Sequence, residues 1–518
     1  MGNVAIELRG ITKRFGSIVA NKNVNLSVNN GEILSLLGEN GSGKTTLMNM
    51  ISGIYFPDEG HIFIDGKEVV IRSPKDAFDY NIGMIHQHFK LVDVFTAAEN
   101  IVLGLDEKYN IKKAAQRVAE ISSKYGFEID PNKKIYEMSV SEKQTVEILK
   151  VLYRGANILI LDEPTAVLTP QESQKLFAVL RRMRNDGKAI IIITHKLHEV
   201  MDISDRVSVL RKGEYIGTVE TDKTTESELT EMMVGKKIDL NIQRSEPKNP
   251  QKRLEVKHIN CMSREGVSLL KDVSFYANSG EILGIAGIAG SGQRELLEAI
   301  AGLQHIDSGE IIYNNPTDNS SEDLKDKTPL EIRNLGVRLS FVPEDRLGMG
   351  LVGNMDIVDN MMLRSYNKGK SMFLSRKSPK TLAENIIEQL EVVTPSAQTP
   401  VRRLSGGNVQ KVLVGREIAA APSVLMAAYP VRGLDINSSY IIYNLLNAQK
   451  ENGVAVIFVG EDLDVLLELC DRIMVIGDGS VTGIVDGRTA TKEQIGLLMT
   501  KSKVHGTEIQ QKEAPKNE

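Results

Sequence analysis

This chain of 518 residues contains only two cysteines, Cys261 and Cys470, and both lie in apolar surroundings. Two cysteines cannot form the disulfide framework of a small secreted domain, so we expect two buried free thiols. No apolar run approaches the roughly 20 residues that a membrane-spanning helix needs. The first residues carry neither a basic region nor a long apolar core, so we expect no signal peptide. These absences predict a cytoplasmic protein.

An excess of positive charge is also missing. Lysine and arginine number 63, aspartate and glutamate number 68, and the formal net charge is −5. A surface that binds nucleic acid needs a basic footprint, so this balance argues against nucleic acid as the partner. The composition, 41% hydrophobic and 25% charged, is that of an ordinary globular protein. At this length a single hydrophobic core is not expected, and the chain should form two or more domains.

The most informative stretch is a glycine-rich loop at residues 38–45, which reads Gly-Glu-Asn-Gly-Ser-Gly-Lys-Thr. It fits the phosphate-loop pattern of Gly, four residues and Gly-Lys-Ser/Thr. The apolar run 32–37 before it predicts a buried strand, and the sequence from Thr46 onwards predicts a helix. Glycines let backbone N–H groups surround phosphate oxygens, while Lys44 would reach the β- and γ-phosphates and Thr45 would hold Mg²⁺. The alternative is a glycine-rich turn with a surface lysine.

The chain is a tandem repeat. Residues 31–34 return 249 positions later as residues 280–283, and the loop glycines return at the same offset. Further along the offset is 266, as Ser139 and Ser405 show, so the second half holds 17 additional residues. We expect this insertion near the polar stretch 314–321, which is typical of a surface loop. The predicted organisation is two homologous domains at residues 1–238 and 253–503. They are joined by a linker at residues 239–252, and a disordered tail follows at residues 504–518.

Within each half, β-rich apolar runs alternate with helical patterns. Residues 158–161 and 189–194 predict fully buried parallel strands. Residues 170–186 between them predict an amphipathic helix that is opened by a proline. This alternation is typical of α/β architecture built on crossover connections.

Polar side chains follow the ends of the predicted strands. Asp162 and Glu163 suit one Mg²⁺ contact and one base that orients a water molecule. His195 ends the next strand, within reach of a γ-phosphate at the carboxyl edge of the sheet. Gln87 closes a short apolar run, where it would face a metal or water, although such a glutamine is usually a solvated cap. Phe15, upstream of the loop, would stack on a flat heterocycle or serve as a core aromatic.

Together these motifs resemble the ATP-binding-cassette ATPases, in the order in which that family carries them. The resemblance rests on residues 38–45, Gln87, residues 138–142, residues 161–164, His195 and residues 404–408. The last of these stretches, Leu-Ser-Gly-Gly-Asn, is the family's signature in nearly ideal form. The match covers almost the whole chain and looks like a double-cassette subunit of a bacterial importer. It implies two tandem P-loop ATPase domains, each with a core parallel sheet, an antiparallel β subdomain and a helical signature subdomain.

The resemblance also implies how the site works. ATP would lie between the phosphate loop of one cassette and the signature of the other, and the chain would hydrolyse it to ADP and phosphate. Glu163 would orient or deprotonate the attacking water, while His195 and Gln87 would sense the γ-phosphate. The implied Mg²⁺ ligands are Thr45, Gln87 and Asp162. The implied ATP-binding residues are Phe15, Gly38, Glu39, Asn40, Gly41, Ser42, Gly43, Lys44, Thr45, Thr46, Ser405, Gly406 and Gly407.

The two halves are not equivalent. The first-half signature is altered, since Ser141 adds a Cβ and Glu142 adds a negative charge, and both would oppose a γ-phosphate. An intact loop would thus face an intact signature, and an altered loop an altered signature, which predicts one hydrolytic site per chain. Neutral drift would give the same kinetics. In the second half the counterparts of Lys44, Thr45, Asp162, Glu163 and His195 are Gln293, Arg294, Ala428, Tyr429 and Glu461.

Substrate and partners rest on the resemblance alone. Residues 427–435 and 460–464 look more like the nucleoside-import branch than the sugar branch, which usually keeps the second Asp-Glu pair. The resemblance implies two transmembrane permeases, an extracytoplasmic substrate-binding lipoprotein and a place at the cytoplasmic face of the membrane. Residues 89–95 would form part of a permease groove or the core of the helical subdomain. The alternatives are a ribose- or galactose-type importer and a soluble double-cassette ATPase acting on ribosomes or nucleic acid.

Overall fold

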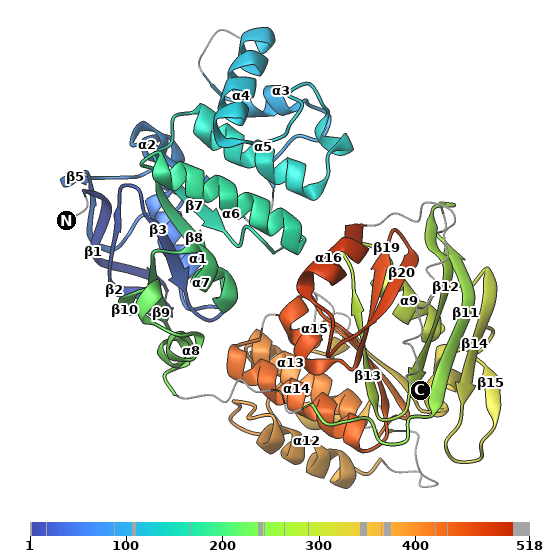
Figure 1. Cartoon of the computed structure of the whole chain (residues 1–518). Coiled ribbons are helices and arrows are strands. Elements are labelled where there is room, and N and C mark those ends of the chain that lie inside the picture. Colours follow the sequence, from blue (N-terminus) through green and yellow to red (C-terminus); the bar gives the residue numbers. More distant parts are fainter. Residues whose placement is uncertain are drawn as a thin grey trace, which may run out of the picture. The chain divides into compact units, whose positions relative to one another are not determined.

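The computed structural model shows two compact units (Figure 1). Unit 1 comprises Met1–Asn241 with Gly433–Tyr440, and unit 2 comprises Ile242–Arg432 with Ile441–Glu518. The predicted tail 504–518 lies outside the described residues. Those are 3–16, 18–86, 89–105, 110–166, 168–236, 242, 244–263, 265–288, 290–341, 350–363, 365–366, 374–419, 421–432 and 434–500.

Unit 1 is built on a ten-stranded sheet. Five strands form its parallel part. Every residue of the strands Ala189–Ile193 and Ile33–Leu37 is buried, as in a sheet that is covered on both faces. The buried parallel strands that the sequence predicts are therefore confirmed. In spatial order these strands are β6 (Ile82–Ile85), β7 (Ile158–Asp162), β8 (Ala189–Ile193), β3 (Ile33–Leu37) and β9 (Arg206–Arg211).

The rest of this sheet is mostly antiparallel. It continues through β10 (Glu214–Glu220), β2 (Ile18–Asn29), β1 (Val4–Phe15), β4 (Glu59–Ile64) and β5 (Lys67–Val69). The glycine-rich loop joins β3 to helix α1, and a predicted proline-opened helix joins β7 to β8, with Thr169 as its N-cap. The helices near the sheet are α1 (Lys44–Ile51), α2 (Pro74–Asp79), α6 (Pro170–Asn185), α7 (Leu197–Ile203) and α8 (Glu226–Val234).

Three helices form a separate lobe at one end of unit 1 (Figure 1). They are α3 (Ala97–Val102), α4 (Ile111–Tyr125) and α5 (Val140–Tyr153). The lobe has a hydrophobic core of its own, with Ile101, Val118 and Leu149 at its centre. This is the helical subdomain that the family resemblance implies.

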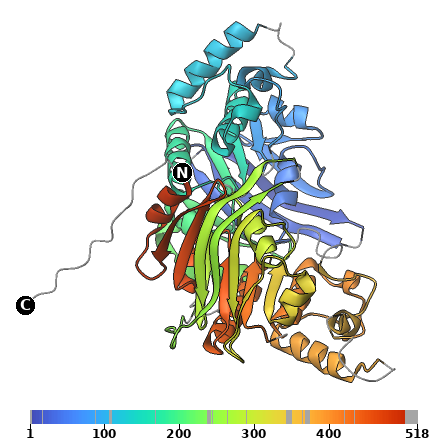
Figure 2. The ribbon, with the colours of Figure 1, turned by 90° about the vertical axis from the view of Figure 1, so that its right-hand side faces the viewer.

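Unit 2 repeats the design with two sheets, and Figure 2 shows the strands of the antiparallel one side by side. The mixed sheet has the order β16 (Val337–Phe341), β17 (Val424–Ala428), β18 (Ala455–Val459), β13 (Glu281–Ala286), β19 (Arg472–Gly477) and β20 (Ser480–Asp486). The antiparallel sheet has the order β12 (Ser268–Asn278), β11 (Lys252–Met262), β14 (Ser308–Asn314) and β15 (Ser321–Asp323). The helices are α9 (Gln293–Ile300), α10 (Pro329–Asn334), α11 (Ile357–Met362), α12 (Lys377–Gln389), α13 (Gly406–Ile418), α14 (Ile436–Glu451), α15 (Leu463–Leu469) and α16 (Lys492–Thr500), although residues 436–440 of α14 are assigned to unit 1.

The prediction of an insertion near residues 314–321 is confirmed in part, because the connection between β14 and β15 is longer than that between β4 and β5. It is wrong in placing all the additional residues there, since they are spread over three places. Pairs of residues with the same structural role show the offset rising in steps. The sequence motifs did not reveal the intermediate offsets, because the motifs themselves lie either before the first rise in the offset or after the last one. The pairs are 249 positions apart at Gly43 and Gly292, 255 at Pro74 and Pro329, 260 at Asn100 and Asn360, and 266 at Ser139 and Ser405.

The expectations about the cysteines and about membrane-spanning helices can be compared with the structure. Cys261 and Cys470 are both free and buried, which confirms the prediction of two buried thiols. Burial raises the pKa of the Cys261 thiol to about 11. Among the helices that the structure describes, none is both long and apolar enough to cross a membrane.

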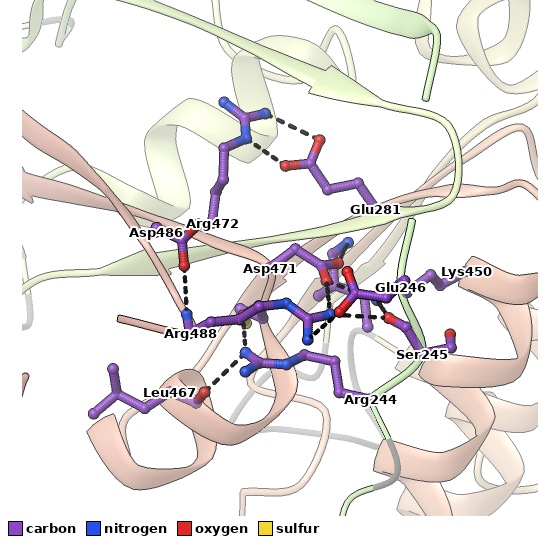
Figure 3. A network of polar contacts seen from close by, with 12 residues as sticks. Arg244, Ser245, Glu246, Glu281, Lys450, Leu467, Asp471, Arg472, Asp486 and Arg488 are labelled. Atoms are coloured by element: carbon purple, nitrogen blue, oxygen red, sulfur yellow. Dashed lines mark hydrogen bonds and ion pairs between the residues drawn. The ribbon is translucent and has the colours of Figure 1, made fainter. Parts of the chain in front are cut away.

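The described part of the predicted linker is bound tightly to unit 2 (Figure 3). Lys450 Nζ lies 2.7 Å from Asp471 Oδ1 and donates to the carbonyl oxygen of Ser245 at 2.5 Å. The side chains of Lys450 and Asp471 are only 1% and 6% exposed. Arg488 adds an ion pair with Glu246 at 2.7 Å. A buried ion pair therefore lies where the linker joins this unit.

We expect Lys450→Ala to destabilise the chain by about 3 kcal/mol, because Asp471 would stay buried without its nearest cation. The measurement is urea denaturation of the full chain. The matched control is Arg184→Ala in unit 1, whose equivalent pair with Asp205 at 2.8 Å is 30% and 38% exposed. An exposed pair contributes at most about 1 kcal/mol. Equal losses in both variants would contradict the prediction.

Candidate functional site

The glycine-rich loop leaves β3 and enters α1 in unit 1. Gly41 and Gly43 have left-handed backbone conformations, with φ of 80° and 95°. A Cβ on Gly43 would lie 2.4 Å from the carbonyl oxygen of Ala20, and one on Gly38 would lie 2.3 Å from that of Leu210. These close approaches require glycine. No side chain caps the N-terminus of α1, so the first-turn N–H groups are available to an anion.

Lys44 is the first residue of α1 and its side chain folds back onto the loop. Only 6% of Lys44 is exposed, and its Nζ donates to the carbonyl oxygens of Gly38 at 2.7 Å and Glu39 at 3.0 Å. Burial lowers the pKa of Lys44, and the carboxylates of Glu163 and Asp162 act in the opposite direction. The loop therefore holds a partly desolvated ammonium group beside the free end of a helix, an arrangement that suits a phosphate.

Two carboxylates meet this loop at the end of β7. Asp162 is the last residue of the strand. Burial and the charge of Glu163 raise the pKa of Asp162 to about 6, while Lys44 and a hydrogen bond with Thr45 oppose the rise. Hydroxyl and carboxylate oxygens are ligands that Mg²⁺ accepts, and it commonly takes one or two carboxylates together with phosphates. The pair Thr45 and Asp162 therefore fits a magnesium ion, whose charge would relieve the repulsion between the carboxylates.

Glu163 is placed by an uncommon backbone conformation. Its φ is 46°, and its N–H donates to the carbonyl oxygen of Ile193 at 2.9 Å. His195 Nδ1 lies 2.9 Å from Glu163 Oε1, and this hydrogen bond lowers the pKa of Glu163. Tyr429 has the same conformation in unit 2, with φ of 50° and an N–H bond to Val459. Such a backbone conformation often marks a functional position. Unit 2 keeps this conformation at Tyr429, although the carboxylate of Glu163 is absent there.

The structure thus brings Lys44, Thr45, Asp162, Glu163 and His195 together in unit 1. The rest of the loop, with Glu39, Asn40, Ser42 and Thr46, belongs to the same site by continuity of the chain. Phe15 is 43% exposed and packs edge-on against Tyr55 at 5.3 Å between ring centroids, so the core-aromatic alternative is wrong. Its stacking on a heterocycle stays a prediction. Gln87 lies outside the described residues.

The signature regions differ between the units in a way that the sequence did not predict. In unit 1, Glu142 Oε2 accepts from the N–H of Ser139 at 2.8 Å, and Glu142 Oε1 lies 2.7 Å from Lys133 Nζ. Burial raises the pKa of Glu142, but the hydrogen bonds with Lys133 and Ser139 lower it, and the net effect is a lower pKa. Its charge is therefore paired with a cation, and the expectation that Glu142 opposes a γ-phosphate stays a prediction. The added Cβ of Ser141 remains.

In unit 2 the intact signature opens α13. Ser405 is the N-cap, and Gly406 and Gly407 form the first turn of the helix. Asn408 takes the place of Glu142, and its Nδ2 donates to Ser405 Oγ at 2.9 Å. A neutral amide therefore closes this helix start, and the two glycines leave the backbone uncovered by a Cβ.

The loop of unit 2 keeps a contact like that of unit 1 but lacks the charged groups of unit 1. Gln293 is 3% exposed, and its Nε2 donates to the carbonyl oxygen of Ile288 at 3.0 Å, much as Lys44 does in unit 1. Arg294 pairs with Glu298 at 2.7 Å. Glu461 stands where unit 1 has His195, and it lies 3.4 Å from Arg432. A neutral amide thus replaces the ammonium group, and the residues that replace Asp162 and Glu163 carry no carboxylate.

The sequence analysis missed residues that do not belong to the motifs but hold the motif segments in place. Thr165 Oγ1 donates to Glu199 at 2.6 Å, and Lys196 pairs with the same carboxylate at 3.0 Å. These bonds fix the turn after Glu163. Asn21 contacts the glycine-rich loop itself. A comparison of the two repeats at the constant offset would have drawn attention to Asn21, because its counterpart is the apolar Leu270.

Comparisons with known proteins agree with this geometry. The family model described as ABC transporter matches residues 21–166 and again residues 270–430. The nucleoside import ATP-binding protein NupA of Lactococcus lactis is 42% identical, over 95% of this chain and 97% of that protein. The guanosine import ATP-binding protein NupO of Bacillus subtilis is also 42% identical, over 96% and 97%. The ribose import ATP-binding protein RbsA 1 of Rubrobacter xylanophilus is 38% identical, over 96% and 98%.

A solved structure shares the fold over nearly the whole chain. It is the complex of the archaeal ribosomal stalk protein aP1 with the archaeal ribosome recycling factor aABCE1. The TM-score is 0.59, with 92% of this chain and 90% of that chain covered. At 16% sequence identity this likeness concerns the fold alone. Together with the repeated family match, it confirms the prediction of two tandem α/β domains of one kind.

Proposed function

This chain belongs to the ABC transporter family of ATP-binding proteins, and from that premise we propose that it drives the import of a nucleoside. Members of this family bind ATP and hydrolyse it to power transport. The observation that carries the nucleoside proposal is the identity of 42% to two importer subunits named for nucleoside and guanosine. The identity to the ribose importer subunit is lower, at 38%.

Unit 1 is proposed as the hydrolytic site. The N–H groups of the loop and Lys44 would hold the phosphates of ATP, and Thr45 and Asp162 would hold Mg²⁺, which neutralises phosphate charge when bound. The hydrogen bond with His195 lowers the pKa of Glu163, and its carboxylate would orient the attacking water and accept its proton. His195 holds Glu163 in place and would contact the γ-phosphate. Phe15 would stack on the adenine, and Gln87 would complete the magnesium shell.

We propose that each chain has one hydrolytic site. The support is the substitution set of unit 2, which removes the ammonium group at Gln293 and the carboxylate at Tyr429 while the backbone is kept. A phosphoryl-transfer site without these charges cannot stabilise its transition state well. The signature residues Ser405, Gly406 and Gly407 would contact the γ-phosphate of the nucleotide in the intact site, as the family resemblance implies.

The proposed partners are two permease subunits and an extracytoplasmic substrate-binding lipoprotein, with the chain at the cytoplasmic face of the membrane and no nucleic acid bound. Within residues 89–95, Val92, Val94 and Phe95 are 37%, 65% and 36% exposed. Leu91 packs on the core of the helical lobe instead. The segment therefore combines an anchored residue with exposed apolar side chains, which supports a contact with a partner helix.

The cargo proposal predicts which solute stimulates hydrolysis. Detergent-solubilised membranes should yield this chain with two multi-spanning permeases and a lipoprotein, identified by mass spectrometry. In that assembly guanosine should raise the ATPase rate several-fold and ribose should not. Stimulation by ribose alone would favour the sugar-importer alternative. Recovery of ribosomal proteins without a membrane partner would contradict the importer altogether.

A further inference from the structure

Asn21 is a polar residue that lies against the glycine-rich loop of unit 1. It belongs to β2, its side chain is fully buried, and its Nδ2 donates to the carbonyl oxygen of Gly43 at 3.2 Å. Gly43 is the N-cap of α1 and directly precedes Lys44. The same carbonyl accepts the backbone N–H of Leu47 at 2.9 Å. Asn21 thus binds the peptide unit that carries the N–H of Lys44.

The preceding peptide unit of the loop is held by a second donor. The N–H of Gly213, in the turn between β9 and β10, donates to the carbonyl oxygen of Ser42 at 3.1 Å. Gly213 is itself fixed, because its carbonyl oxygen accepts from Lys22 on β2 at 2.8 Å. In a trans peptide the C=O and N–H groups point in opposite directions. Holding these two carbonyls therefore aims the N–H groups of Gly43 and Lys44 away from β2, toward the side where an anion binds.

Unit 2 keeps the backbone donor and lacks the side-chain donor. Gly479 donates to the carbonyl oxygen of Ser291 at 3.0 Å, which matches the bond made by Gly213. Leu270 stands where unit 1 has Asn21, and it is fully buried. Its Cδ2 would lie 3.0 Å from a Cβ built on Gly292, so it occupies the same place against the loop. Leucine cannot donate a hydrogen bond, and this loss occurs in the unit that also lacks the lysine.

Asn21 leaves one buried polar atom unpaired within the described part of the chain, a cost in stability that indicates another purpose. Its Oδ1 is buried and has no hydrogen-bond partner among the residues that the structure describes. Turning the amide over would not help, because Oδ1 would then face the carbonyl oxygen of Gly43. An unpaired amide oxygen in a protein core raises the free energy of the folded state. An apolar residue such as Leu270 avoids this penalty, so selection for stability alone would favour leucine.

We propose that Asn21 is a positioning residue of the ATP site, which orients the Gly43–Lys44 peptide and thereby increases the affinity of the loop for the phosphates of ATP. The inference rests on the proposed ATP site of unit 1. It adds Asn21 and Leu270 to the differences that separate an intact loop from an altered one.

The test compares Asn21→Leu with the wild-type full chain by calorimetric titration with ATP and Mg²⁺. We expect the affinity to fall about tenfold, the scale of one lost hydrogen bond to a site that must be pre-organised. The melting temperature should stay the same or rise, because the unpaired oxygen is removed. A residue with only a structural role would show the opposite pattern, with a lower melting temperature and unchanged affinity. The matched control is Leu270→Asn in unit 2, which should lower the melting temperature and leave the affinity for ATP unchanged.

Wild-type affinity in a folded Asn21→Leu chain would overturn the inference. If leucine disturbs the fold, Asn21→Ala provides the same test with a smaller side chain, and unchanged affinity there would again overturn it. Lys44→Ala separates this failure from a failure of the proposed function. Loss of binding in Lys44→Ala but not in the Asn21 variants would reject the role of Asn21 alone, whereas a wild-type chain that binds no ATP would reject the ATP site itself.

Discussion

Replacing Glu163 by glutamine should lower the rate of ATP hydrolysis by a factor of about 10² to 10⁴, the range that a positioned general base contributes. Glutamine keeps the size of the side chain and its hydrogen-bonding to His195, but it cannot accept the proton of the attacking water. ATP binding should persist, because Lys44 and the uncapped N-terminus of α1, which would hold the phosphates, are unchanged in this variant. The measurements are phosphate release by the membrane complex and titration of the full chain with ATP.

The matched control for this variant is Tyr429→Phe in unit 2. Tyr429 occupies the equivalent backbone position, with the same positive φ, and it carries no carboxylate. We expect the hydrolysis rate to change less than twofold, since this residue has no part in proton transfer. Loss of ATP binding in Glu163→Gln would contradict the account, because it would assign Glu163 to the binding of nucleotide rather than to the chemical step.

Replacing Lys44 by alanine should remove both binding and hydrolysis of ATP. The ammonium group is the cation that the loop holds, and charge-assisted hydrogen bonds to phosphate are among the stronger polar interactions. A loss of two such bonds predicts a decrease of about 10²-fold or more in affinity. The affinity should be measured at several salt concentrations, because an electrostatic contribution to wild-type binding weakens as salt increases.

Gln293→Ala is the matched control for Lys44→Ala. Gln293 makes the same contact with its own loop, through a bond to the carbonyl oxygen of Ile288, but it carries no charge. We expect the hydrolysis rate to stay within about twofold of the wild type, as for a position outside the reacting site. A large loss in this variant would show that the altered loop contributes to turnover and would contradict the proposed division between the units.

Much of the fold could be predicted because its signals are local. The apolar runs of β3, β7 and β8 are short, rich in branched side chains and bounded by turn residues, and they became buried parallel strands. The phosphate-loop pattern carries its own geometry, since Gly41 and Gly43 have the conformations that only glycine adopts easily. The repeat offset revealed the lost charges of the second half without any structure.

The remaining features depend on contacts between distant parts of the chain. Glu142 was expected to carry a negative charge, and its ion pair with Lys133, which precedes the helix, could not be read from the sequence. The role of Asn21 depends on the contact of β2 with a loop some twenty positions later, and no local pattern predicts such a contact. The spread of the additional residues over three places was hidden because the motifs that give the two offsets lie before the first place and after the last.

One of the two units in each chain is proposed to hydrolyse ATP, and the other is not. The most direct test is the residual rate of phosphate release by the complex that carries Glu163→Gln, relative to wild type at saturating ATP and Mg²⁺. We expect a residual rate of about 1% of the wild-type value or less, because unit 2 has Tyr429 and Ala428 where a base and a metal ligand would be needed. A residual rate of about half the wild-type value would mean that both units turn over, and it would contradict a single hydrolytic site per chain.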